Sequence, residues 1–179
     1  MIGLDALFWT FVLLFAIIGS LRGWAKELLV TFAVILSLFI IIVTESFIPF
    51  VRDTLATNPG PPIFWLRVGL MGGLVFFGYQ TPNIPKFASS SKFVRDRLQD
   101  TLLGFFLGAV NAYFFWGTIW YYLHEIGYVF QVISPPQPGT SSFEATQQLL
   151  PLLAPSWIGA PVIYFAVAVA FAFVLVVFI

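Results

Sequence analysis

Five long runs of apolar residues divide the chain, and short polar or proline-rich stretches separate them. A helix needs about 20 mainly apolar residues to cross a hydrocarbon layer roughly 30 Å thick. Such runs predict helices, because a helix satisfies its own backbone hydrogen bonds where water is absent. The pattern therefore predicts one all-α domain over residues 1–179, an integral membrane helical bundle of about five transmembrane helices, with spans at 4–21, 28–48, 63–79, 101–123 and 157–179.

The stretch between the first two runs carries an unusual concentration of charge for this chain. Arg22, Lys26 and Glu27 follow the first run closely and precede the second. A short charged segment between two apolar runs is typical of the turn of a membrane hairpin. These residues suit two roles, the anchoring of the spans at the interface and the recognition of a ligand or of anionic lipid head groups. Anchoring alone accounts for their charges, so it is the favoured interpretation.

Prolines mark the other connections. Residues 58–62 and 134–139 are too rich in proline and glycine to be helical. Ser141 and Glu144 have the spacing of a capping box, which predicts a short amphipathic helix at 143–153. That helix is too short to span, so we expect it on the membrane surface. A second amphipathic segment, from Lys92 onward, is expected at the lipid head groups.

Composition supports the membrane assignment and excludes several other classes. The chain is 60% hydrophobic and only 9% charged, with a mean hydropathy of +0.97, so lipid must solvate much of its surface. The formal net charge is zero, which gives no basic field to attract nucleic acid. Cysteine is absent, which excludes disulfides and thiolate metal sites. The start of the chain lacks the basic region of a cleavable signal, so we expect the first span to be retained.

The distribution of basic residues predicts the orientation, because connections rich in lysine and arginine stay in the cytoplasm. Basic residues concentrate in the first and third connections, at Arg22, Lys26, Lys86, Lys92, Arg95 and Arg97. The second connection has only Arg52, and Arg67 lies one turn inside the next span, where we expect its side chain to extend back to the interface. The N-terminus is therefore expected outside and the C-terminus in the cytoplasm.

Glycines four residues apart recur in or beside three predicted spans. The pairs are Gly19 and Gly23, Gly69 and Gly73, and Gly104 and Gly108. This spacing lets helix backbones approach closely, so we expect packing seams within the bundle or between copies of the chain. Asn111 lies in the middle of the fourth span, where its amide needs a partner, and we expect an interhelical hydrogen bond there.

Two further polar residues are candidates for a functional role. Asp5 begins the first span, where the helix dipole favours a negative charge, and Arg22 is too far along the same helix to pair with it directly. An anchoring role is therefore favoured over a proton relay. His124 follows an aromatic cluster at 116–122 and is a candidate axial ligand for a haem or a chlorophyll-type pigment. No P-loop, dinucleotide fingerprint, G-x-S-x-G or HExxH motif is present, so we expect no enzymatic activity and no catalytic residue.

Residues in the first half of the chain resemble a motif of the colicin V production protein family of bacterial inner-membrane proteins. That family has an aspartate early in its first span, then Arg-Gly, then a basic residue followed by glutamate. The chain has Asp5, Arg22-Gly23 and Lys26-Glu27 at the same spacing. The resemblance implies a location in the bacterial cytoplasmic membrane.

The second half of the chain resembles the same family less closely. Asp100, Leu103-Gly104 and Gly108 are similar to the family's run into its last core span, and residues 148–151 are similar to its short Leu-x-Pro element. The chain departs from that run by having Thr101, Asn111 and Ala112 where the family has Arg, Arg and Gly. The resemblance covers residues 1 to about 153, and the fifth span is additional.

The resemblance implies a non-enzymatic role in toxin production or export, or in envelope homeostasis, through binding of other membrane proteins or self-association. One alternative is an accessory subunit of a larger light-harvesting, reaction-centre or respiratory complex, with contact to a pigment or quinone. A second alternative is a small transporter or channel with Asp5, Glu45 and Asn111 along a polar path. The sequence itself specifies no cofactor.

Overall fold

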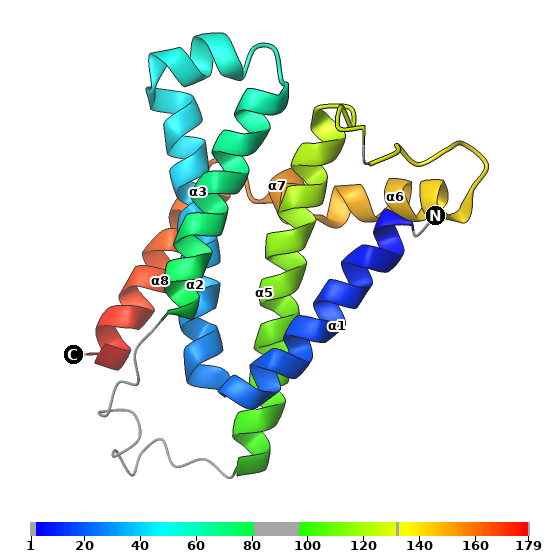
Figure 1. Ribbon diagram of the computed structural model, residues 1–179. Helices are drawn as coiled ribbons and strands as arrows, with labels where there is room; N and C mark the ends of the chain where they lie inside the picture. The colour runs from blue at the N-terminus through cyan, green and yellow to red at the C-terminus, as the bar shows by residue number, and fades with distance from the viewer. Residues whose placement is uncertain (1–2, 81–96, 132, 179) are drawn as a thin grey trace.

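The computed structural model describes residues 3–80, 97–131 and 133–178, and every regular element in these ranges is helical (Figure 1). Four of its helices are long and apolar enough to cross a membrane: α1 (Leu4–Arg22), α2 (Trp24–Phe47), α3 (Pro61–Tyr79) and α5 (Arg97–Glu125). They correspond to the first four predicted spans. The predicted all-α membrane bundle is therefore confirmed.

The first connection is much shorter than the charged turn that the sequence suggests. α2 begins at Trp24 rather than at residue 28, so Gly23 alone separates it from α1. Gly23 has φ of +86°, a conformation that side chains with a Cβ rarely adopt. Lys26 and Glu27 consequently lie in the first turn of α2, inside the helix rather than in a loop.

The second connection contains η1 (Val51–Leu55), a π-helical turn, and leads to the proline-rich stretch. α3 starts at Pro61, earlier than the predicted residue 63. Proline is well tolerated at the first helical position, because the backbone N–H that it lacks would have no partner inside the helix. Pro61 and Pro62 therefore begin α3.

The predicted surface helix divides into two pieces. α6 (Ser141–Leu149) is followed by η2 (Leu150–Leu152), a single 3-10 turn that contains Pro151. Thr140, not Ser141, is the N-cap, because its side chain accepts a hydrogen bond of 3.2 Å from the backbone N–H of Phe143. α6 lies beside the start of α1 (Figure 1).

The prediction of a continuous fifth span at 157–179 is wrong at its N-terminal end. A short helix, α7 (Ala154–Trp157), ends before Gly159, and α8 (Val162–Phe178) starts only after Pro161. α8 has 17 residues. It is therefore about 26 Å long, somewhat shorter than a hydrocarbon layer of roughly 30 Å.

The helices pack unequally. α1 lies along α5 and α2 lies against α3, α5 and α8, whereas α3 contacts α5 at few positions (Figure 1). Side chains buried among these helices form the main core, and they include Phe8, Val30, Val34, Ile41, Met71 and Trp120. α3 is thus held mainly by α2.

The two ends of the bundle are named here after Arg22 and Glu125. The Arg22 end, at the bottom of Figure 1, holds the junction of α1 with α2 and the start of α5. The Glu125 end, at the top, holds η1 and the end of α5. Lys86, Lys92 and Arg95 lie outside the described residues. The second half of the amphipathic segment expected from Lys92 is described, and from Arg97 it forms the first turn of α5.

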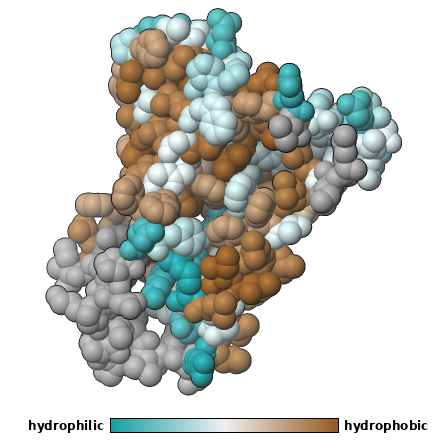
Figure 2. Space-filling model, viewed as in Figure 1, coloured by the Kyte–Doolittle hydropathy of each residue, from teal (hydrophilic) through white to brown (hydrophobic). Residues whose placement is uncertain are grey.

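Apolar side chains also cover the outside of the molecule. Figure 2 shows brown apolar surface over most of the visible face, with teal polar groups gathered toward the upper and lower ends. Among the exposed side chains, Leu21 and Val176 are 83% exposed and Phe77 is 73% exposed. Such an apolar surface matches a lipid environment, since a protein in water rarely leaves a large contiguous apolar area uncovered.

Candidate functional site

Three of the predicted packing glycines bring the backbones of α1 and α5 together. A Cβ atom added at Gly19 would overlap the carbonyl oxygen of Gly104, and one added at Gly104 would overlap that of Gly19. A Cβ atom at Gly108 would overlap the carbonyl oxygen of Phe15. Only glycine fits these three positions while the helices keep this separation.

The glycines of α3 lie in a different environment. A Cβ atom added at Gly69, Gly72 or Gly73 would meet no atom within 4 Å in the part of the chain that the structure describes. Trp65, Phe76 and Phe77 surround these glycines in sequence and are exposed. We call Gly69, Gly73 and these three aromatic residues the α3 face. The expected packing seam at Gly69 and Gly73 is therefore not formed by the described residues.

A buried ion pair joins α1 to α2 at the Arg22 end. The Nη1 of Arg22 lies 2.6 Å from the Oε1 of Glu27, whose side chain is fully buried. The guanidinium of Arg22 also lies over the ring of Tyr79, 4.3 Å from its centroid, and its Nη2 donates to the Tyr79 carbonyl oxygen at 3.2 Å. The motif residues Arg22 and Glu27 thus form one cluster with Tyr79 of α3.

Asn111 completes this cluster from α5. Its Nδ2 donates to the Oε2 of Glu27 and to the backbone carbonyl of Glu27, both at 2.9 Å. Its Oδ1 accepts from the hydroxyl of Thr31 at 2.8 Å. Both N–H donors of the amide are therefore used in holding α5 against α2, which is the interhelical hydrogen bonding that the sequence predicts.

Asp100 and Lys26 flank the cluster. The Oδ1 of Asp100 accepts a hydrogen bond of 3.0 Å from the backbone N–H of Trp24, the first residue of α2. The negative charge near a helix N-terminus is favourable and satisfies a backbone donor that the helix cannot. Lys26 lies half-buried in the first turn of the same helix. The structure therefore brings Arg22, Glu27 and Asp100 to the same end.

A second buried cluster, at the Glu125 end, was not predicted. Arg67 does not extend back to the interface but lies buried, with its residue only 6% exposed. Its Nε lies 2.5 Å from the Oε1 of Glu45 in α2, and its Nη1 lies 2.7 Å from the Oε2 of Glu125 in α5. Its guanidinium also lies over the ring of Tyr122, 4.4 Å from the centroid.

Arg67 corrects the expectation of an interfacial, extended side chain, and the reason is its position on α3. The residue faces α2 and α5, where two carboxylates compensate its charge, so its guanidinium remains inside the protein. The signal in the sequence was an arginine inside one span together with glutamates near the ends of two others. Their separations along the chain give no indication that the three meet.

His124 and Asp5 also lie toward the Glu125 end. His124 is exposed, and its Nδ1 lies 3.2 Å from the hydroxyl of Tyr128, where burial raises the pKa of the phenol. Among the described residues, no group of three histidine, aspartate or glutamate side chains is arranged to hold a metal ion. Asp5 accepts a hydrogen bond of 2.7 Å from the hydroxyl of Ser142 in α6, and so fixes α6 beside α1.

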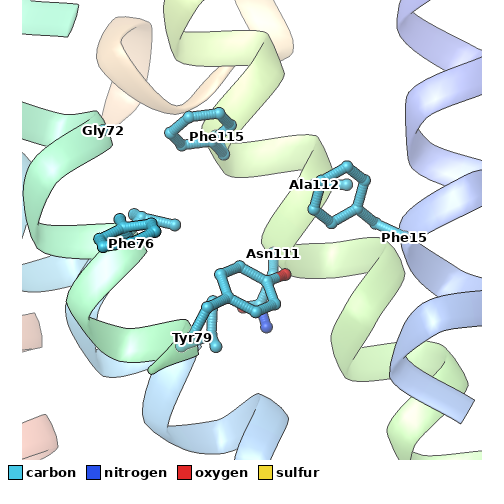
Figure 3. Close-up of a pocket in the computed structure, with 9 residues that line it drawn as sticks. Phe15, Gly72, Phe76, Tyr79, Asn111, Ala112 and Phe115 are labelled. Carbon is cyan, nitrogen blue, oxygen red and sulfur yellow. The ribbon is translucent and has the colours of Figure 1, made fainter. Parts of the chain in front are cut away.

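A cavity of about 180 Å³ lies between α1, α3 and α5, next to the Glu27 cluster (Figure 3). The rings of Phe15, Phe76, Phe115 and Tyr79 surround it, and Asn111 and Ala112 lie on its α5 wall. The cavity exists because α3 contacts α5 so little while α1 and α5 pack tightly. Of the residues that line the cavity, only Asn111 and Ala112 were distinguished in the sequence.

The polar path expected for a transporter is not assembled in the described residues. Asp5 pairs with Ser142, Glu45 with Arg67, and Asn111 with Glu27 and Thr31. Each side chain therefore belongs to a separate contact between two elements.

Comparison with protein-family models, with curated proteins and with solved structures gives no match for this chain.

Proposed function

We propose that this chain is a non-enzymatic, multi-pass protein of the bacterial inner membrane, of the colicin V production type, and that it acts by binding another membrane protein. Its contribution would be to toxin production or export, or to envelope homeostasis. The binding surface in this proposal is the α3 face. The N-terminus lies outside and the C-terminus lies in the cytoplasm.

The observation that carries the proposal is the contrast between the glycines of this chain. Gly19, Gly104 and Gly108 are each in backbone contact with a neighbouring helix. Gly69 and Gly73 have the same four-residue spacing, but the described residues supply no neighbour to them. In this protein, glycines four residues apart allow helices to pack closely. A glycine pair without a neighbour therefore supports the binding of a transmembrane helix from a second chain.

Lipid tails are as apolar as leucine, so hydrophobicity does not drive helix association inside the bilayer. Association there depends on close packing, which small residues permit. The exposed rings of Trp65, Phe76 and Phe77 beside the glycines would add contact area on either side of such a helix. A transmembrane helix with a small or flat face therefore fits the α3 face best.

The basic residues support the proposed orientation. Arg22, Lys26 and Arg97 lie at the Arg22 end, which would be cytoplasmic. At the Glu125 end, Arg52 is paired with Asp53 at 2.7 Å, and Arg67 is paired with Glu45 and Glu125. The bias among the described residues is therefore toward the same side that the full sequence indicates.

The test is purification of the protein from its native membrane in a mild detergent, followed by mass spectrometry of the chains that remain bound. We expect a second chain in fixed ratio with the wild type, and loss of that chain in the double variant Gly69→Leu with Gly73→Leu. The matched control is Ala168→Leu, which enlarges an exposed small residue on α8. The control should retain the second chain.

The identity of the retained chain separates the possible roles. If the retained chain is an export or envelope component, the result would support the colicin V production type. If it is a photosynthetic or respiratory subunit with bound pigment or quinone, the accessory-subunit role would replace the proposed one. A wild-type protein that purifies as a single chain without any partner would overturn the proposal.

A further inference from the structure

The cavity beside the Glu27 cluster is lined almost entirely by carbon. Its walls come from Phe15 of α1, from Gly72 and Phe76 of α3, and from Phe115 of α5 (Figure 3). It has a volume of about 180 Å³, close to that of an engineered cavity of about 150 Å³ that stays dry and binds benzene. A cavity of this kind therefore favours an apolar occupant over water.

The polar groups at the cavity do not match a polar ligand. Both N–H donors of Asn111 already bond to Glu27, and its oxygen accepts from Thr31. Tyr79 contributes its ring, which Arg22 covers on one face, and its hydroxyl. A polar solute would therefore exchange its hydrogen bonds to water for at most that one hydroxyl, which is costly in an apolar site.

The size of the cavity limits how much of a ligand it holds. A space of about 180 Å³ fits a short length of hydrocarbon chain or a single small ring, not a whole haem, chlorophyll or phospholipid. The rest of any larger ligand must lie outside the cavity. The cavity sits between membrane-spanning helices, so the molecules that reach it are those dissolved in the bilayer.

The Arg22 end supplies a place for a polar head group. Arg22 is 20% exposed in its side chain and lies over Tyr79, which lines the cavity. Of the five N–H donors of a guanidinium, the described residues use one on the Glu27 carboxylate and one on the Tyr79 carbonyl. The remaining donors suit a phosphate or a carbonyl oxygen at the interface.

We propose that this cavity holds one hydrocarbon chain of a membrane amphiphile, with the head group of that molecule at Arg22. The chain is either the acyl tail of a phospholipid or the isoprenoid tail of a quinone, since both present flexible, apolar carbon chains. The inference goes beyond the proposed function, because it needs no partner protein. Phe76 belongs both to the cavity wall and to the α3 face, so the test uses the purified protein without a partner.

The experiment reconstitutes the purified protein into two kinds of phosphatidylglycerol vesicle. One carries a phospholipid with a photoreactive diazirine near the end of one acyl chain, and the other carries a quinone with a diazirine in its isoprenoid tail. After irradiation, mass spectrometry locates the labelled residues. We expect labels on cavity residues such as Phe15 and Phe115, from one probe or the other.

Substitutions at the cavity wall separate a specific site from general lipid contact. Gly72→Phe should fill the cavity and reduce its labelling about tenfold or more, the factor expected from losing the burial of about two methylenes. Gly73→Phe is the matched control, since Gly73 is equally open but does not line the cavity. Ala112→Leu narrows the cavity from the α5 wall and should act like Gly72→Phe.

Helical circular dichroism and gel-filtration volume identify the variants that remain folded. The proposal would be overturned if both probes label only residues outside the cavity. It would also be overturned if the cavity residues are labelled equally in the wild type and in the folded cavity variants. Labelling lost in the cavity variants and retained in Gly73→Phe would support it. The probe that labels then decides between a phospholipid and a quinone.

Discussion

At the scale of single residues, two arginines determine how the helices are held. Arg22 and Arg67 lie at opposite ends of the bundle, and each pairs with glutamate while covering a tyrosine ring. Inside a low-dielectric protein, an ion pair is destabilising unless its geometry is good and its hydrogen bonds are complete. Removing one partner leaves the other charge uncompensated, so both arginines should be sensitive positions.

Replacement of Arg67 by methionine tests this account. Arg67→Met leaves the carboxylates of Glu45 and Glu125 near each other without a cation, and we expect it to lower the free energy of unfolding by about 3 kcal/mol. The measurement is unfolding in mixed micelles with increasing dodecyl sulfate. Arg52→Met is the control, because Arg52 and Asp53 form a pair that is more than half exposed and should matter little.

A second substitution distinguishes charge from packing at this position. If the uncompensated carboxylate causes the loss, adding Glu45→Gln to Arg67→Met should restore part of the stability. Equal stability of the single and double variants would show that lost packing of the arginine side chain, not charge, is responsible.

At the scale of the helices, enlarging a glycine should have opposite effects on stability at two places, the contact of α1 with α5 and the α3 face. Gly104→Leu places a side chain where the Gly19 carbonyl lies, so α1 and α5 must separate. We expect a loss of about 3 kcal/mol in the free energy of unfolding, as for a strongly overpacked core. Gly73→Leu enters open space and should leave the stability of the isolated chain nearly unchanged. Similar losses in both variants, measured in the same micelles, would contradict the assignment of these two contacts.

The helices themselves were predictable to different degrees. The first four spans follow from apolar length alone, because backbone hydrogen bonding leaves a membrane segment little alternative to a helix. The division between α7 and α8 had a local signal in residues 159–161, Gly-Ala-Pro, which the apolar composition of the surrounding run obscured. Charge alone predicts a loop at the first connection, but Lys26 and Glu27 fit inside a helix whose first backbone N–H is satisfied by Asp100, so the single-residue junction at Gly23 has no signal in the charge pattern.

At the scale of the whole molecule, long-range pairing was the part that sequence reasoning could not supply. The spacing of Arg22 and Glu27 suggested a local cluster, and Asn111 was expected to bond to another helix, although its partner was not identified. Arg67 meets Glu45 and Glu125 across 22 and 58 positions of sequence, and no periodicity encodes that contact. The cavity likewise depends on the uneven packing of α3, which emerges only when all the helices are assembled.

The whole assembly leaves Gly69 and Gly73 of the α3 face without a neighbour among the described residues, beside aromatic rings that are exposed. The central claim is that another membrane protein covers this α3 face. The absence of cysteine from the chain makes the claim directly testable, because a single introduced cysteine is a unique attachment point.

The decisive measurement is photo-crosslinking in native membranes from a benzophenone attached to cysteine at position 73, as Gly73→Cys, with Ala168→Cys on α8 as the matched control. The account predicts one discrete protein adduct of defined mass from position 73 and none from position 168. Adducts with lipid alone at position 73, or the same protein adducts from both positions, would contradict it.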